Sequence, residues 1–88
     1  MTLDELKEAL ESNTLSYSRV DTSALVNIMK FVDVKLEMDR HTLDYYYKMS
    51  VAELVKSEMP TDELETLKKQ GWSFSDDKKS LIVYLKNN

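Results

Sequence analysis

Three carboxylates near the amino terminus have the spacing most suggestive of a chemical role. Asp4, Glu8 and Glu11 recur at i, i+4 and i+7, which places them along one side of a helix. Neighbours at this spacing lie about 5–6 Å apart at Cβ, which is comparable with the separation of phosphates along a nucleic-acid strand. Because like charges at i and i+4 destabilise a helix slightly, the stripe is either an ordinary solvated face or the contact surface for a basic partner.

A second group of acidic residues lies in the carboxyl-terminal half. Residues 51–66 carry five carboxylates against one lysine, whereas residues 67–88 carry five lysines against two aspartates. The whole chain has a net charge of −4 and a pI of about 4.9. The sequence therefore predicts an acidic molecule with a basic carboxyl end. The five carboxylates are Glu53, Glu58, Asp62, Glu63 and Glu65.

The residue types that build catalytic and metal sites are scarce. The chain has one histidine, one glycine and no cysteine, which leaves no structural zinc set and no phosphate-binding glycine loop. His41 would need a nucleophile or an orienting carboxylate, and its neighbours Asp39 and Asp44 suit caps or surface charges. Asp33, Glu37 and Asp39 lack the glycine turn of a calcium loop. The sequence predicts no enzymatic activity, no metal site and no cofactor.

The bulk composition fits one folded domain over residues 1–88. Hydrophobic residues make up 42% of the chain and charged residues 32%, which argues against disorder. The apolar runs are far shorter than the roughly 20 residues that span a bilayer, so no membrane association is expected. Residues 1–5 lack the basic and apolar pattern of a secretory signal, and the absence of cysteine makes a reducing cytoplasm the default compartment.

The helical part of the domain is expected to cover residues 1–70. Thr2 and Glu5 have capping-box spacing and open a first helix. A second helix is expected from Asp21 or Thr22, because the apolar residues that follow recur at i, i+3, i+4 and i+7. The residues expected to dominate the core are Leu6, Leu10, Leu25, Ile28, Met29, Val32, Leu54, Leu64, Leu67, Trp72, Ile82 and Tyr84.

Three further helices are indicated by caps and breakers. One is expected over about 41–48. Ser50 stands three residues before a glutamate and caps the next helix, which Pro60 ends. Thr61 is expected to cap the last helix, and Gly71 stands where a left-handed residue closes a helix.

The apolar–polar pattern changes from a helical period to an alternating one after residue 71 and predicts a β-hairpin over 72–85. A lone hairpin is marginal in water, so it must pack on the helices or pair with a third strand. Residues 15–20 or 33–38 alternate apolar and polar residues and can supply that strand, although 33–38 also fits a continued helix; a second copy of the chain is the other source. The expected fold class is α+β, mainly helical, with four to five short helices packed against a C-terminal β-hairpin.

The run of tyrosines at 45–47 is the most distinctive aromatic feature. Three consecutive residues span about 200° of a helix, so one core cannot bury Tyr45, Tyr46 and Tyr47 together. An exposed tyrosine is a common interface anchor. The alternative is that two rings are buried with their hydroxyls at the surface and the third covers a loop.

The segment 64–72, with the hairpin that turns at Asp76 and Asp77, resembles the last helix and wing of winged-helix DNA-binding domains over about 25 residues. The resemblance implies that this helix serves recognition and meets phosphates with basic side chains. Acidic residues at the start of the helix would repel the DNA backbone, whereas Lys68, Lys69, Lys78 and Lys79 favour contact. Residues 67–72 are also similar to the helix–strand junction of HicA-type RNase toxins, but no histidine follows residue 41 to do their chemistry.

Three functional hypotheses follow. The leading one is a non-enzymatic module that binds a basic protein, in its sharpest form a DNA mimic that inhibits a DNA-binding protein, as suits the accessory proteins that phages make early in infection. The second is direct DNA binding through the hairpin, and the third is self-association, as a homodimer, through the tyrosines or an open strand edge. The expected contact residues are Asp4, Glu8, Glu11, Glu53, Glu58, Asp62, Glu63, Glu65, Tyr45, Tyr46 and Tyr47.

Overall fold

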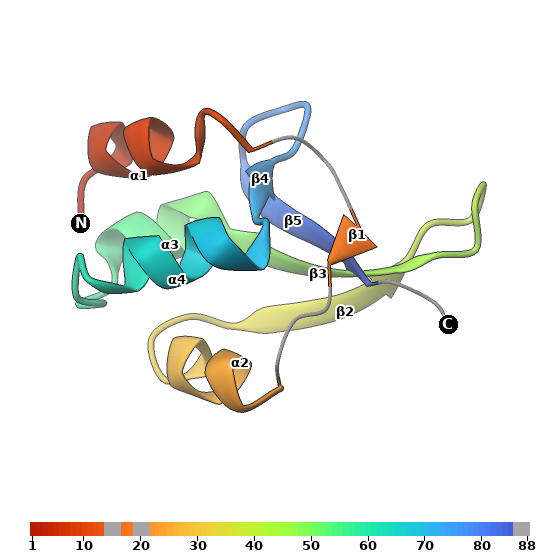
Figure 1. The fold of residues 1–88 in the computed structure, drawn as a ribbon, viewed down its shortest axis with the longest axis horizontal. Coiled ribbons are helices and arrows are strands. Elements are labelled where there is room, and N and C mark those ends of the chain that lie inside the picture. The colour runs from red at the N-terminus through yellow and green to blue at the C-terminus, as the bar shows by residue number, and fades with distance from the viewer. Residues whose placement is uncertain (14–16, 19–21, 86–88) are drawn as a thin grey trace.

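A computed structural model describes residues 1–13, 17–18 and 22–85 and places a β-sheet at the centre of the molecule (Figure 1). This part of the chain forms four helices and five strands. In chain order they are α1 (Leu3–Leu10), β1 (Tyr17–Ser18), α2 (Thr22–Met29), β2 (Val34–Met38), β3 (Tyr45–Ser50), α3 (Val51–Lys56), α4 (Glu63–Gln70), β4 (Ser73–Phe74) and β5 (Ser80–Leu85).

The expectation of a mainly helical fold is wrong, because the sheet is larger than a terminal hairpin. Over the described residues its strands are ordered β1-β5-β3-β2, and β4 pairs separately with β5. The helix expected over 41–48 does not form, since the tyrosine run begins strand β3. Tyrosines have high strand propensity, and pairing on both sides of β3 decides the conformation. Residues 34–38 form β2, which selects the strand interpretation of 33–38.

The strand registers align side chains in rows across β2, β3 and β5. β3 is antiparallel to both neighbours, with Tyr46 opposite Glu37 on one side and Tyr84 on the other. β1 pairs with β5 in parallel and falls within the expected segment 15–20, of which 15–16 and 19–20 lie outside the described residues. Asp21, one expected start of the second helix, also lies outside them. The expected hairpin over 72–85 is confirmed by the antiparallel pairing of β4 with β5.

The core lies between one face of the sheet and the helices. Eight of the twelve expected core residues are buried there, but Met29 is 55% exposed and Leu64 is only partly buried. In β5 the expectation of Ile82 and Tyr84 is wrong by one residue: Leu81 and Val83 face the core instead. A shift of one residue moves every side chain of a strand to the other face. The confirmed set is Leu6, Leu10, Leu25, Ile28, Val32, Leu54, Leu67 and Trp72.

The amino-terminal caps of α1 and α3 confirm the expected helix starts. The capping box of Thr2 is complete, and the Ser50 hydroxyl accepts a hydrogen bond from the Glu53 amide. Helix α3 ends at Lys56, before Pro60. The expected Thr61 cap is wrong, because α4 begins at Glu63 after an N-cap, Asp62, whose side chain makes no capping bond. Backbone hydrogen bonds hold the start of this helix instead, from the Glu63 amide to the Pro60 carbonyl oxygen and from the Leu64 amide to the Thr61 carbonyl oxygen, each at 3.0 Å.

The carboxyl ends of α1 and α4 are joined by one side chain. Asn13 Nδ2 donates to the carbonyl oxygens of Lys68 at 3.2 Å and Trp72 at 2.8 Å. Gly71 closes α4 in the expected left-handed conformation, with φ of 87°. Figure 1 shows α1 and α4 running in the same direction, gathered with α3 over one end of the sheet, while the β2–β3 hairpin extends away from them. No described helix is long and apolar enough to cross a bilayer.

Candidate functional site

The acidic stripe of α1 points away from the core. Asp4, Glu8 and Glu11 are exposed, while Leu6 and Leu10 on the opposite side are fully buried. Among the residues that the structure describes, the one ion pair joins Lys48 Nζ to Glu37 Oε2 at 4.0 Å. The three carboxylates of the stripe are therefore not neutralised by a described cation, and substituting them removes no buried contact.

The parallel packing of α1 and α4 brings acidic residues from both halves of the sequence to one end of the molecule. The first turns of the two helices lie at the same end, because Asn13 holds their last turns together (Figure 1). The loop 57–62 leads into that end of α4. We call five exposed carboxylates on α1, on this loop and at the start of α4 the acidic end; they are Asp4, Glu8 (one turn further along α1), Glu58, Asp62 and Glu65.

Three of the eight expected carboxylates are not part of the acidic end. Glu11 lines a cavity of about 400 Å³ with Lys7 and Lys78. Glu53 lines a smaller one of about 150 Å³ beside the sheet, together with two lysines, and Glu63 is half-buried. The acidic contact surface is therefore narrower than the sequence pattern indicates.

Lysines gather on the other side of α1, around the β4–β5 turn. Lys56, Lys78 and Lys79 line a cavity of about 640 Å³ whose wall includes Leu3. Lys78 also lines the cavity that holds Lys7. The Val51 amide donates to the carbonyl oxygen of Lys79 at 2.9 Å, which holds this turn against the start of α3. We call Lys7, Lys56, Lys78 and Lys79 the lysine cluster; chain segments far apart in sequence contribute to it.

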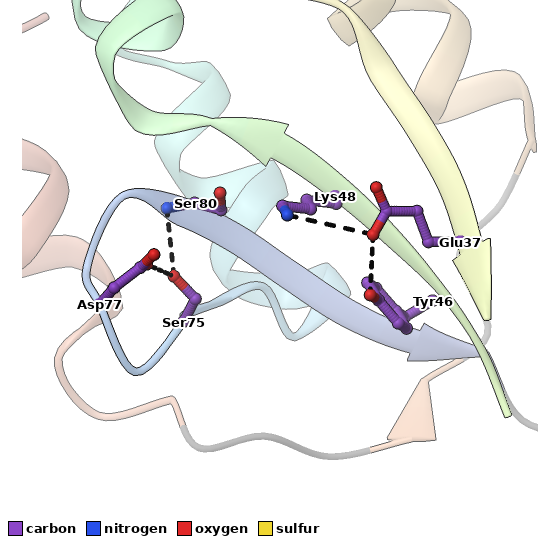
Figure 2. Close-up of polar contacts among 6 residues, drawn as sticks. All are labelled: Glu37, Tyr46, Lys48, Ser75, Asp77 and Ser80. Carbon is purple, nitrogen blue, oxygen red and sulfur yellow. Dashed lines mark hydrogen bonds and ion pairs between the residues drawn. The ribbon is translucent and has the colours of Figure 1, made fainter. Parts of the chain in front are cut away.

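A network of polar side chains covers the face of the sheet opposite the core (Figure 2). The Tyr46 hydroxyl donates to Glu37 Oε2 at 2.8 Å, and Lys48 approaches the same oxygen. The rings of Tyr46 and Tyr84 lie 5.4 Å apart between centroids, at 55°. The Tyr84 hydroxyl donates to Asp39 Oδ2 at 3.3 Å. These bonds engage Glu37 and Asp39, which are two of the three carboxylates weighed above as calcium ligands.

The network changes the acidity of its members. The hydrogen bond to Glu37 raises the pKa of Tyr46 to about 12, because ionisation would break the bond and set two negative charges together. Burial, with the nearby Asp39 charge, raises the pKa of Tyr84. The backbone amide of His41 lowers the pKa of Asp39 by donating to its carboxylate. Each shift has its cause in burial, in a hydrogen bond or in a charge within this part of the sheet.

The β4–β5 turn is ordered by a similar but separate set of bonds (Figure 2). The Ser75 hydroxyl donates to Asp77 Oδ1 at 2.6 Å and accepts from the Ser80 amide at 3.2 Å. The bond from Ser75 lowers the pKa of Asp77. His41 is exposed in the β2–β3 connection, and its amide donates to Asp39 Oδ1 at 2.8 Å. Within the described ranges no three histidine, aspartate or glutamate side chains converge as ligands for a metal ion.

The three consecutive tyrosines alternate between the two faces of the sheet, as successive strand residues do. Tyr46 lies on the polar face, Tyr47 packs against the core, and Tyr45 is 46% exposed beyond the helices. The helical geometry expected for them is wrong, but the exposure of one ring is confirmed.

An apolar surface that sequence reasoning missed surrounds the β2–β3 hairpin. Seven of the eight large exposed hydrophobic side chains of the described chain fall within residues 26–45. The expectation that Met29 belongs to the core is wrong, and the period-2 pattern of 33–38 is a signal for Leu36 and Met38 alone. The seven are Val26, Met29, Phe31, Leu36, Met38, Leu43 and Tyr45.

Comparison with models of protein families, with curated proteins and with solved structures finds no significant match to this chain.

Proposed function

We propose that this chain is a non-enzymatic protein-binding module whose acidic end occupies the basic surface of a nucleic-acid-binding protein in the cytoplasm. What supports the proposal is that exposed carboxylates stand on α1, on the 57–62 loop and on α4, and that the first turns of the two helices lie at one end of the molecule (Figure 1). Carboxylates spaced like phosphates and held on rigid helices present a preformed anionic surface, which lowers the ordering cost of binding.

The acidic end is also separable from the fold. The side chains of Asp4 and Glu8 are exposed and make no hydrogen bond to any described residue, whereas the side chain of their neighbour Glu5 accepts bonds from Thr2 in the capping box. Charge at the acidic end contributes to steering a basic partner, which accelerates association by roughly 10–1,000-fold at low salt. A variant without this charge should therefore lose binding while it keeps the helix.

The test compares the wild-type chain with the triple variant Asp4→Asn, Glu8→Gln, Asp62→Asn as bait for the heparin-binding fraction of a cell extract. The wild type should retain basic nucleic-acid-binding proteins at low salt, and added duplex DNA should release them because both ligands occupy one surface. The triple variant should retain about tenfold less. The matched control is Asp33→Asn, Glu53→Gln, Asp76→Asn, which removes the same formal charge from exposed positions elsewhere.

Retention by the control variant equal to the wild type supports the acidic end as the contact surface. Equal retention by the triple variant, or captured proteins that duplex DNA does not release, would refute the proposal.

The lysine cluster favours direct binding of nucleic acid as a second candidate function. Four lysines around the β4–β5 turn line two adjoining cavities, and the turn follows α4 as a wing follows the recognition helix in the resemblance noted above. A gel shift on random duplex DNA tests it: binding that Lys78→Glu with Lys79→Glu abolishes supports this candidate. Under the leading proposal, neither the wild-type chain nor this double variant shifts the mobility of the DNA.

A further inference from the structure

We propose that two copies of this chain associate through β2, which pairs antiparallel with β2 of the second copy about Leu36 and joins the two sheets. This inference goes beyond the proposed function and rests on a different part of the surface. β2 is an edge strand, because the described chain supplies β3 on one side and no strand on the other. An edge with unpaired backbone groups is a template for another strand.

The sequence of β2 is complementary to itself in this arrangement. In Val34-Lys35-Leu36-Glu37-Met38, pairing about Leu36 sets Lys35 opposite Glu37 of the partner subunit and Val34 opposite Met38 of the partner subunit. In each of the two charged pairs the members carry opposite charges, and all apolar side chains of the two strands meet on one face. Cross-strand pairs of this kind stabilise a sheet.

Neighbouring registers are less favourable. Pairing about Lys35 places the two lysines opposite each other, and pairing about Glu37 does the same with the two glutamates. A half-step shift sets apolar residues of one copy against charged residues of the other on the same face. Charge and apolar pattern therefore specify the register centred on Leu36.

The charges of β2 are incompletely matched within one chain. The internal register sets Lys35 directly opposite Lys48, a like-charged pair, and Lys48 is the lysine that approaches Glu37. Within the described residues Lys35 makes no ion pair. A lysine on an edge strand normally opposes pairing with another chain, but here the second copy offers it a carboxylate.

The exposed apolar side chains lie where a second copy would cover them. Leu36 and Met38 are 55% and 44% exposed on the core-side face of β2. Residues 30–33 connect α2 to the first residue of β2, and Figure 1 shows the β2–β3 hairpin extending beyond the second half of the strand. An antiparallel pair therefore sets the hairpin of each copy, with Leu43 and Tyr45, near α2 of the other, with Val26 and Met29. The twofold axis then brings these apolar residues from both copies to the centre of the interface, which is the apolar centre that homodimer interfaces carry.

The test is sedimentation equilibrium of the full chain over a wide concentration range. The wild type should rise from one chain mass to two. Lys35→Glu and Glu37→Lys should each set like charges against each other and raise the dimer dissociation constant by about tenfold or more. An equimolar mixture of the two variants should recover a dimer, because each copy then offers the charge that the other lacks. Circular dichroism confirms that each variant is folded.

A wild type that stays one chain mass at all concentrations would overturn the inference, as would a Lys35→Glu dimer as tight as the wild type or a mixture that remains monomeric. The acidic-end triple variant separates the two proposals: it keeps β2 intact, so it should dimerise as the wild type does even if its retention of basic proteins is unchanged.

Discussion

Tyr46 and Glu37 face each other across β3 and β2, and the Tyr46 hydroxyl donates to Glu37 Oε2 at 2.8 Å. The bond fixes the second tyrosine of the run on the polar face of the sheet. It also holds the carboxylate of Glu37, a residue of the edge strand β2, on that same face. One hydrogen bond thus links the aromatic run to the strand edge proposed to join two copies.

Alkaline pH should weaken the fold through Tyr46. Its pKa is raised to about 12, above the ordinary value of 10, so its contribution to stability is complete below pH 10 and is lost as the pH rises towards 12. Tyr46→Phe should remove this loss and cost about 1 kcal/mol near neutral pH, the value of one hydrogen bond. Urea unfolding at several pH values, with absorbance titration of the tyrosines, measures both effects. An equally steep alkaline loss in the variant would contradict the assignment.

The left-handed residues at 71 and 78 should respond oppositely to substitution. Gly71 has φ of 87° and closes α4, so Gly71→Ala should destabilise the fold by about 1 kcal/mol. Lys78 has φ of 61° in the β4–β5 turn, and Lys78→Gly should stabilise by up to about 1 kcal/mol because glycine adopts this conformation without strain. Thermal unfolding of both variants checks the signs; two changes in the same direction would contradict this account of the turns.

Asn13 should be required for the arrangement of the acidic end. Its side chain donates two hydrogen bonds that hold α1 to the last turn of α4. Asn13→Ala should cost about 1–2 kcal/mol and let α1 open locally. Faster hydrogen exchange of the α1 amides, with unchanged exchange in β3 and β5, is the expected result. Unchanged exchange in α1 would show that the helix is held by its leucines alone.

Local signals in the sequence determined the helix ends and turns well. The Thr2 capping box, the Ser50 cap and the left-handed Gly71 each act within a few residues, so their spacing is sufficient evidence. The carboxyl-terminal hairpin was predictable for the same reason, since its period changes sharply after Gly71. Leu6 and Leu10 were predictable as core because a helix has one buried stripe.

The sheet was less predictable because long-range pairing decides it. The tyrosine run fits a helix or a strand by local pattern, and only its neighbours in β2 and β5 select the strand. In β5 five consecutive residues are apolar or aromatic, so the sequence does not reveal which of the two alternating sets of side chains faces the core. The result is that Leu81 and Val83 exchange roles with Ile82 and Tyr84.

The candidate site was predictable in charge but not in shape. Asp4 and Glu8 are exposed as the helical spacing indicates, yet the placement of the start of α4, which Asp62 precedes, at the same end of the molecule depends on the parallel packing of α1 and α4. Glu11 shares a cavity with Lys78, a residue 67 positions away in the chain, and no local pattern contains that contact. Tertiary packing alone separates the acidic end from the lysine cluster.

The salt dependence of the association rate tests the central claim most directly. It is measured by stopped flow between the wild-type chain and a basic protein that it retains. The account predicts a rate that falls steeply with rising salt, and a shallow dependence for the variant Asp4→Asn, Glu8→Gln, Asp62→Asn. Equal slopes for the two proteins would contradict the claim that the acidic end is the surface that meets the partner.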